Sequence, residues 1–233
     1  AGRSVPELDV RSVGMYCYLC GMKAFLQAIG RVMYRLVMPL RRRRLKNRSV
    51  SIVSNDCWSS FMYRFYGLPF NSPFVGLFIM PDHYLAMLEN PEVLATPPRM
   101  TSSAESVYAG RLSDLPPYPL GILPGGIEIH FLHYATAEEA LDKWTRRMSR
   151  LDWDNCIVKF SRNNGCTDGH LRRFDALPFP HKVAFSTAPL PGVRSVVAVP
   201  EFAGDDQLGR YWKLADLHYD FGRHADAIRQ SER

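Results

Sequence analysis

The sequence predicts an α/β protein, a three-layer α/β/α arrangement with a mainly parallel or mixed sheet and one antiparallel hairpin. Three observations lead to this fold class. From residue 49 onward, short apolar and β-branched runs alternate with segments of helical periodicity. A Gly-Gly pair at 125–126 separates two such runs and can supply the positive φ of a hairpin turn. Hydrophobic residues make up 46% of the 233 residues, which is enough for a large core.

The first predicted elements are a strand and a helix joined by a short polar turn. Residues 49–53 read as a buried strand, and residues 58–66 read as an amphipathic helix. Gly67 follows directly, the residue most often found just beyond a helix end. Asn71, Ser72 and Pro73 then indicate a turn, and its two polar residues are candidates for substrate binding.

The next stretch predicts a second strand, a helix and a surface excursion. The apolar run at 74–80 is typical of a strand covered on both faces. A Pro-Asp pair then starts a helix over 83–90, which a second proline ends. Residues 95–118 are rich in Pro, Ser and Thr, and we expect a surface excursion there with a weak strand pattern at 106–112.

The second half of the chain predicts the hairpin and further β/α alternation. Residues 118–123 and 127–134 form the two hairpin strands. Thr136 and Glu139 form a capping box that opens a helix running to about Arg150. The remaining predicted elements are a strand at 153–160, a helix at 169–177, strands at 183–186 and 195–199, and one or two helices within 206–230.

Charge divides the chain into an N-terminal extension, residues 1–48, and a single α/β domain, residues 49–233. The extension holds 11 Lys and Arg against 2 Asp and Glu, whereas the domain holds 18 against 21. A nucleic-acid-binding domain would spread basic residues over its fold, so we expect no nucleic-acid partner. An odd number of cysteines, five, in a chain of this size favours reduced thiols and a cytoplasmic location.

The extension predicts a membrane-surface helix. Between residues 15 and 40 the polar residues recur every four positions and form one narrow stripe: Lys23, Gln27, Arg31 and Arg35. Basic residues follow, beginning with Arg41, Arg42, Arg43 and Arg44. This pattern is typical of an in-plane anchor on the inner face of the plasma membrane, or of a helix packed on the domain or on another subunit. Cys17 and Cys20 form a lone C-x-x-C without further ligands, so no metal site is predicted.

The turn between the first predicted strand and helix, Ser54-Asn55-Asp56-Cys57, is the main candidate site. Helix amides point outward at such a junction and suit anion or carbonyl binding. Cys57 is a candidate nucleophile whose thiolate the helix would stabilise, and Ser54 is the competing nucleophile. Asn55 could donate to a developing oxyanion, and Asp56 lies beside either nucleophile. The alternative is that Asp56 or Asn55 caps the helix and Cys57 packs.

Two histidines of the hairpin are candidate general bases, because imidazole titrates near neutral pH. Strict alternation along the second strand places His130 and His133 on opposite faces. If the strand ends at Leu132, His133 falls in the following loop, where active-site residues usually lie. We therefore favour His133, although each could be a hydrogen-bonded structural residue.

A second polar turn, SRNNGCTD at 161–168, also joins a predicted strand to a helix. If both strands are parallel, Cys57 and Cys166 could line one cleft. Asn163, Asn164 and the following glycine permit a left-handed turn that could cradle a phosphate. Thr167 and Asp168 are candidate binding residues too, with helix capping as their alternative role.

Several blocks in fixed order resemble the bacterial family called domain of unknown function nineteen-nineteen. They are SIVSNDCW, NSPFVGLFI, PGGIEIHFLHY with the helix after it, and NNGCTDGHLRRFDALPFPHKV. The resemblance covers roughly Leu45 to Val199. Members are often labelled exopolysaccharide biosynthesis proteins, so the resemblance implies an α/β fold and a role near surface-polysaccharide assembly, with acyltransferase activity by analogy.

These expectations combine into a transferase that modifies sugar hydroxyls, with an acyl-CoA donor and a saccharide or lipid-linked saccharide as substrate. One alternative is glycosyl or phosphoryl transfer from a nucleotide sugar, although no Asp-x-Asp metal motif stands out. The other is a non-catalytic binding module of a membrane polysaccharide-assembly complex. Its stacking surface would consist of Trp58, Tyr63, Phe65 and Tyr66.

Overall fold

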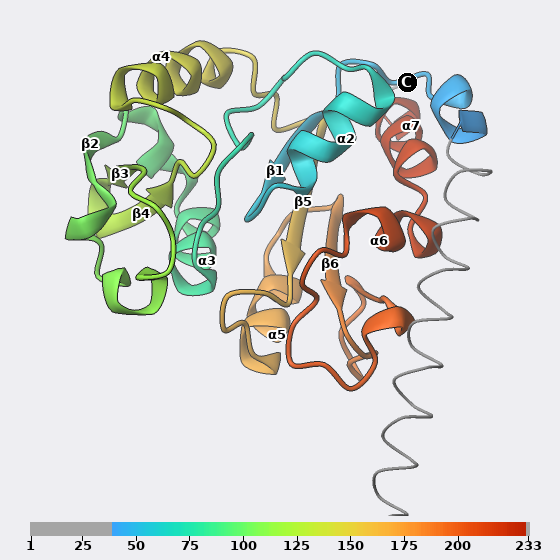
Figure 1. The fold of residues 1–233 in the computed structure, drawn as a ribbon. Coiled ribbons are helices and arrows are strands. Elements are labelled where there is room, and N and C mark those ends of the chain that lie inside the picture. Colours follow the sequence, from blue (N-terminus) through green and yellow to red (C-terminus); the bar gives the residue numbers. More distant parts are fainter. Residues whose placement is uncertain (1–38, 232–233) are drawn as a thin grey trace, which may run out of the picture.

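The computed structural model describes residues 39–231 and confirms the predicted α/β class (Figure 1). Four parallel strands form one sheet in the order β1-β5-β6-β7. They are β1 (Ser51–Ser54), β5 (Cys156–Ser161), β6 (Lys182–Ser186) and β7 (Val196–Ala198). Since β1 and β5 are parallel neighbours with Ser54 opposite Lys159, their C-terminal ends lie at the same edge of the sheet.

Helices cover both faces of this sheet, which explains why its strands are apolar on both sides. One face packs against α2 (Trp58–Tyr66), α6 (Trp212–His218) and α7 (Phe221–Ser231). The other packs against α3 (Pro81–Glu89) and α5 (Asp168–Ala176). Lys159 is the exception to the apolar pattern, because it is a charged residue inside β5 and is fully buried.

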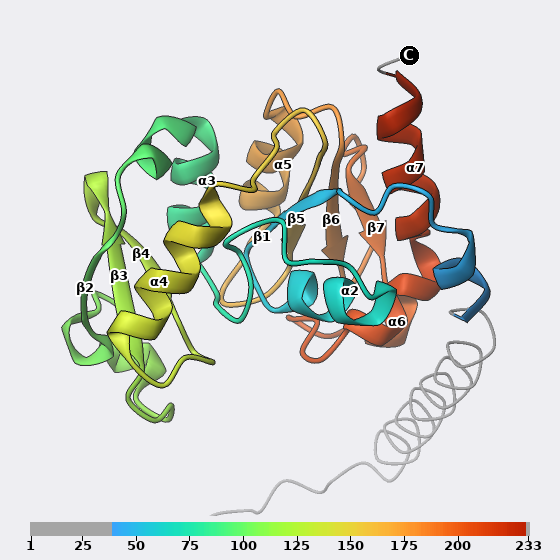
Figure 2. The ribbon, with the colours of Figure 1, turned by 90° about the horizontal axis from the view of Figure 1, so that it is seen from above.

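The predicted hairpin is confirmed, but it belongs to a separate antiparallel sheet of order β2-β3-β4. Its strands are β2 (Arg99–Ser102), β3 (Pro119–Leu123) and β4 (Ile127–His130). Gly125 and Gly126 both adopt positive φ in the turn, as predicted. Figure 2 shows α3 between this sheet and the parallel sheet, and α4 (Ala137–Met148) packs against β2 and β3.

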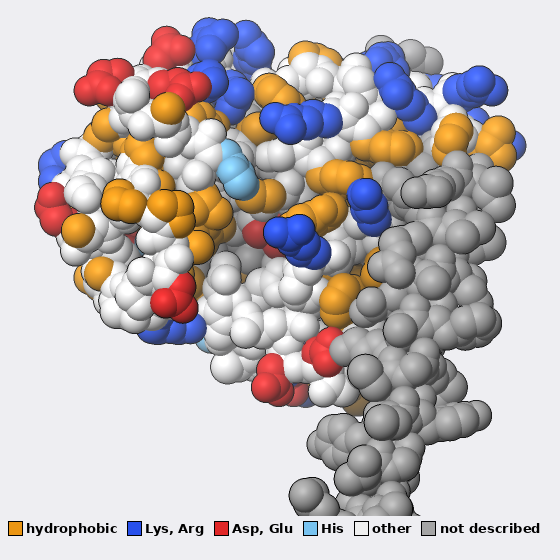
Figure 3. Space-filling model, in the orientation of Figure 1, with side chains coloured by type: hydrophobic (Ala, Val, Ile, Leu, Met, Phe, Trp, Pro, Cys, Tyr) orange, Lys and Arg blue, Asp and Glu red, His pale blue; other side chains and the backbone are white. Residues whose placement is uncertain are grey.

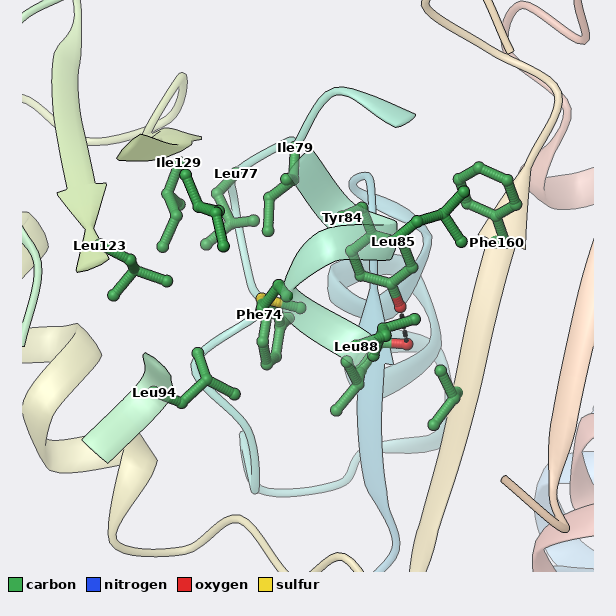
Figure 4. Close-up of a cluster of buried hydrophobic side chains, with 14 of the residues drawn as sticks. Phe74, Leu77, Ile79, Tyr84, Leu85, Leu88, Leu94, Leu123, Ile129 and Phe160 are labelled. Carbon is green, nitrogen blue, oxygen red and sulfur yellow. Dashed lines mark hydrogen bonds between the residues drawn. The ribbon is translucent and has the colours of Figure 1, made fainter. Parts of the chain in front are cut away.

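Helix α3 therefore joins the two sheets through one hydrophobic core (Figure 4). Its Tyr84 ring stacks on Phe160 of β5 with the ring centroids 5.7 Å apart. The Tyr84 hydroxyl is hydrogen-bonded to the carbonyl oxygens of Val53 and Lys159, at 3.0 and 2.9 Å. This contact holds the C-terminal ends of β1 and β5 in place, directly beneath the polar turn that follows β1.

Residues 74–80 do not form the predicted strand. Gly76 has a φ of +73°, which interrupts extended backbone, and one isolated bridge joins Phe78 to His130 of β4. The amide of Ile79 donates to the carbonyl of Asn55, 2.9 Å away. The run is apolar because it passes through the core between the two sheets, and its sequence pattern resembles that of a buried strand for this reason.

Two other boundaries in this half of the chain differ from prediction. The weak strand pattern at 106–112 contains a 3-10 turn (Ala109–Leu112), and the edge strand lies earlier, at β2. Strand β4 ends at His130 and not near Tyr134, because the chain turns after Phe131. Thr136 caps α4 as predicted, accepting a hydrogen bond from the Glu139 amide at 3.1 Å.

The described end of the basic extension, residues 39–48, is attached to the C-terminal helices. Arg41 donates to the carbonyl of Asp216 and forms an ion pair with Asp220. The amide and side chain of Asn47, which is fully buried, bond to Asp226 and to the Ala225 carbonyl. Residues 39–48 thus pack on the domain, whereas the predicted apolar helix and Cys17–Cys20 lie outside the described residues. Within residues 39–231, no helix has the length and hydropathy needed to cross a bilayer.

Candidate functional site

The Ser54–Cys57 turn lies at the C-terminal edge of the parallel sheet, the usual ligand-binding edge of open α/β folds. Asp56 is the centre of its contacts. Its carboxylate accepts hydrogen bonds from the Lys159 ammonium at 2.6 Å, the Ser161 hydroxyl at 2.7 Å and the Tyr211 hydroxyl at 2.9 Å. It also accepts from the amide of Trp58, the first residue of α2, at 3.0 Å, although the N-cap position of that helix is Cys57. We call Asp56, Lys159, Ser161 and Tyr211, together with Asn55, the strand-end cluster.

Burial and charge act together on the two ionised groups of this cluster. Burial raises the pKa of Asp56, but the Lys159 charge and the hydrogen bonds from Lys159, Trp58 and Ser161 outweigh it, so the pKa lies below its ordinary value. Complete burial lowers the pKa of Lys159 from 10.5 to about 8, against the attraction of Asp56. At neutral pH the pair is therefore charged on both sides, with Lys159 closer to losing its proton than an exposed lysine.

Asn55 and Ser54 take structural positions beside this pair. The Asn55 side-chain oxygen accepts from Lys159 at 3.2 Å and from Ser161 at 3.3 Å. Its amide nitrogen is buried and has no hydrogen-bond partner among residues 39–231. The Ser54 hydroxyl is fully buried and donates to the carbonyl of Asp56 at 3.0 Å. Ser54 is thus enclosed, and a substrate carbonyl cannot reach it in this conformation.

A cleft of about 430 Å³ opens beside the strand-end cluster. Figure 3 shows a hollow on the face that carries α2, with Lys, Arg and His side chains around it. Cys57 and Trp212, the chain neighbours of Asp56 and Tyr211, both line the cleft, so its wall lies next to the cluster. The full lining is Cys57, Ser60, Phe61, Arg64, Phe70, Val75, Gly76, His133, Tyr134, Lys143, Arg147 and Trp212.

Cys57 faces the cleft as a thiol. Burial, with the Asp56 charge beside it, raises the pKa of Cys57 to about 12. This is opposite to the stabilised thiolate expected at a helix start, because these two effects exceed the stabilisation by the nearby Lys159 charge. The Cys57 thiol instead lies 3.8 Å from the carbonyl oxygen of Leu77 as a weak donor.

The two candidate histidines lie in different environments. His133 follows β4 in a turn, as favoured, and lines the cleft with an exposed side chain. Its backbone amide donates to Gly76, and its ring has no hydrogen-bond partner within the described residues. His130 is fully buried, stacked on Phe78 at 4.4 Å and hydrogen-bonded to the Tyr118 hydroxyl at 3.0 Å. Burial lowers the pKa of His130 to about 4, so it is a neutral core residue.

The second polar turn is left-handed as predicted, with positive φ at Asn164 and Gly165. Its amides are nevertheless already engaged: Asn164 donates to the Gln207 side chain, Cys166 to the Asn163 carbonyl and Thr167 to His170. These amides are therefore not free to bind a phosphate in the predicted cradle. Thr167 and His170 form a capping box for α5, and Asp168 is paired with Arg162. Cys166 is buried and does not line the cleft with Cys57.

Three other predicted binding residues have structural roles. Trp58 is fully buried and packs against Phe185, Tyr219 and Phe221, and Tyr63 and Tyr66 are also core residues. The predicted stacking surface is therefore wrong for these three rings, because this face of α2 covers the sheet, and of its four members only Phe65 is partly exposed. The Ser72 hydroxyl donates to Ile52 at 2.5 Å, and the Asn71 carbonyl accepts from Ser51.

Sequence reasoning missed the basic wall of the cleft and most of the strand-end cluster. Signals for two of these residues were present. Lys159 interrupts the apolar pattern of a buried strand, and Arg147 continues the buried stripe of α4 that contains Ala140 and Trp144. Tyr211 and Trp212 gave no such signal, because they reach the site through the tertiary fold from the far end of the chain. Among residues 39–231, no group of three or more His, Cys, Asp or Glu side chains could hold a metal ion.

Comparison with known proteins places this architecture in a family. A protein of Haemophilus influenzae with the name "Uncharacterized protein" is 34% identical over 174 residues, which cover 74% of this chain and 79% of the relative. The family model described as "Domain of unknown function (DUF1919)" matches residues 30–229, a span that contains the strand-end cluster and the whole cleft lining. The chain therefore belongs to the DUF1919 family.

Proposed function

We propose that the protein is a transferase of exopolysaccharide biosynthesis that moves an acyl group from an acyl-CoA donor to a saccharide hydroxyl. The observation that carries the proposal is His133, an exposed imidazole inside a cleft whose walls are aromatic and basic. A cleft that combines apolar and aromatic surface with several polar groups is typical of small-molecule sites. The polysaccharide setting is the expectation drawn above from the resemblance of the sequence blocks.

The cleft residues can be assigned roles in a direct transfer. His133 accepts the proton of the acceptor hydroxyl as its oxygen attacks the thioester carbonyl. The new C–O bond forms, the C–S bond breaks, and the proton passes from His133 to the leaving CoA thiolate. Phe61, Phe70 and Trp212 offer faces on which a sugar ring can stack. Cys57 takes no covalent part in this scheme, because its raised pKa keeps it a thiol.

The test is a mass-spectrometric assay of the purified full chain with acetyl-CoA and a panel of oligosaccharides. We expect His133→Asn to lower the transfer rate about 100-fold or more, since general-base catalysis contributes about that much. His181→Asn, at a histidine outside the cleft lining, is the matched control and should keep full activity. Cys57→Ala should also remain active. Equal rates for the His133 variant and the unaltered protein would refute the proposal.

Transfer from a nucleotide sugar is the second candidate, because the lining includes three cations and four aromatic side chains that would also suit a nucleoside diphosphate. Substituting a panel of nucleotide sugars for acetyl-CoA in the same assay distinguishes the two donors. Saccharide binding without turnover, unaffected by His133→Ala or Cys57→Ala, would instead favour a non-catalytic module.

We also place the protein at an anionic membrane surface, where a lipid-linked saccharide would be available. Arg42, Arg43 and Arg44 are exposed on the described end of the basic extension. The Arg42 side chain passes beside Gly67, just beyond the end of α2 that carries Arg64 of the cleft. A basic surface close to the cleft is what docking on anionic headgroups requires.

A further inference from the structure

Arg147 is a buried cation with no carboxylate within ion-pair distance among residues 39–231. It lies on the buried stripe of α4, is 8% exposed and lines the cleft. One N–H donates to the Tyr134 hydroxyl at 2.7 Å, and the guanidinium stacks 4.8 Å from the centre of the Phe70 ring. No ion pair joins it to any Asp or Glu of residues 39–231. The Arg147 charge is therefore balanced only at longer range, by the Glu139 carboxylate, and the guanidinium can take an anion directly.

Two further cations face the same cleft. Lys143 lies one turn before Arg147 on α4; it is paired with Glu139 and lies 5.5 Å from the centre of the Tyr134 ring. Arg64 comes from the last turn of α2. The twelve lining residues include these three cations and no carboxylate. The lining therefore carries an excess of positive charge from two helices, even with Lys143 paired to Glu139 and Asp56 next to Cys57.

We propose that Arg147, Lys143 and Arg64 form a binding site for the phosphate or pyrophosphate group of a substrate. A guanidinium fork matches the oxygen geometry of phosphate, and an ammonium adds a point charge that tolerates several orientations. The volume of about 430 Å³ lies within the usual range of ligand pockets and accommodates a pyrophosphate with part of its nucleoside. The proposed function enters only in the identity of the donor that binds here. Coenzyme A and nucleotide sugars both carry a pyrophosphate, so either donor fits the site.

Stacking on one ring and a hydrogen bond to another side chain fix the orientation of the Arg147 guanidinium. Phe70 covers one face of the guanidinium, and Tyr134 holds one N–H while its own hydroxyl donates to Val75 at 2.5 Å. The other N–H groups have no acceptor within the described residues, and none of them is enclosed without solvent access. These donors are thus held in place before a ligand arrives, which lowers the entropy cost of binding.

The test is calorimetric titration of the full chain with pyrophosphate, inorganic phosphate and ADP, together with the fluorescence of tryptophan, since Trp212 lines the cleft. We expect pyrophosphate to bind, and Arg147→Met to weaken it about ten- to a hundredfold. The control is Arg146→Met, which alters the next residue of α4; that arginine is 56% exposed, is paired with Asp142 and lies outside the lining. Its affinity should be unchanged.

Thermal unfolding separates a binding role from a structural one. Arg147→Met should keep or raise the melting temperature, because it replaces a buried unpaired charge with an apolar side chain of similar length. Lys143→Met, at a more exposed position, gives a second variant that should fold and bind more weakly. The proposal would be overturned if pyrophosphate at millimolar concentration, in 10-fold excess over the protein, did not bind. It would also be overturned if Arg147→Met bound pyrophosphate as tightly as the unaltered protein, or if the protein bound malonate as tightly as pyrophosphate.

The outcomes also separate this site from the proposed activity. Arg147-dependent pyrophosphate binding without any acyl transfer would leave the phosphate site standing and refute the acyltransferase. Acyl transfer that depends on His133 but is not altered by Arg147→Met would support the acyltransferase and refute the phosphate site.

Discussion

The buried pair of Lys159 and Asp56 makes the stability of the protein depend on pH in an unusual range. Lys159 is fully buried, and its pKa falls from 10.5 in the unfolded chain to about 8 in the folded protein. Below pH 8 both states hold the proton, and above pH 10.5 both have lost it. Between these values the unfolded chain binds one more proton than the folded protein, so the contribution of Lys159 to the free energy of unfolding rises with pH.

The size of this effect follows from the same two values. The difference between 10.5 and about 8 corresponds to about 3 kcal/mol, gained between pH 8 and pH 10.5. Asp56 has the opposite range: its lowered pKa gives stability that is present above pH 3.8 and is lost as the pH falls through the folded-state value. The two titrations are far apart in pH and can be read separately.

The assay is urea unfolding at 25 °C, followed by tryptophan fluorescence, at intervals from pH 7 to pH 11. The quantity compared is the difference in unfolding free energy between the unaltered protein and Lys159→Met, because the titrations of tyrosines and cysteines cancel in this difference. Removing Lys159 leaves Asp56 buried alone and costs about 3–5 kcal/mol near neutral pH. The double variant Asp56→Asn/Lys159→Met removes both charges and should recover much of this loss.

Lys213→Met, which removes an exposed lysine of α6, is the control for the loss of one positive charge. We expect the unaltered protein to gain about 3 kcal/mol relative to either Lys159 variant between pH 8 and pH 10.5. A difference that stays flat or falls over this range would show that Lys159 is not desolvated as the structure indicates.

Three further results are expected. Iodoacetamide at pH 8 should alkylate Cys57 about a thousandfold more slowly than an unhindered thiol, because its pKa is about 12, and rapid modification in peptide mass spectrometry would contradict this. Thr167→Ala should lower the free energy of unfolding by about 1 kcal/mol through loss of the α5 cap, and an unchanged urea midpoint would argue against that cap in solution. Replacing Arg43 and Arg44 by Gln should weaken the free energy of binding to phosphatidylserine vesicles by about 1 kcal/mol per residue, measured by sedimentation, whereas the exposed Arg194→Gln should not change it. Equal vesicle binding by both variants would contradict membrane docking by this segment.

Most elements of the fold could be predicted because their signals are local. Thr136 and Glu139 mark a helix start, Gly67 marks a helix end, and the Gly pair after Pro124 marks the hairpin turn. The failure at 74–80 has a clear cause: periodicity reports that a segment is buried on both sides but not whether its backbone pairs with a sheet. Gly76 turns this segment between two sheets, and nothing nearby in the sequence shows that there are two.

The candidate site was predicted in part. The turn at Asp56 lies at the ligand-binding edge of the sheet, and His133 lies in the cleft, because strand ends and loops are positions that sequence patterns reveal. The pKa of Cys57 was expected to move the other way. Its direction depends on the desolvation of the thiol and on the ionised Asp56 next to it, and burial of that degree is a property of the packed molecule.

The sequence by itself determined the α/β class, the hairpin, the caps and the strand-end position of the polar turn, since each depends on residues only a few positions apart. The tertiary structure alone decided what surrounds that turn. Lys159 from β5 and Tyr211 from before α6 converge on Asp56 because the parallel pairing of β1 and β5 and the packing of α6 bring distant segments together. In the same way, Arg64 and Arg147 share a cleft because α2 and α4 pack on either side of a connection that runs through the core between the two sheets.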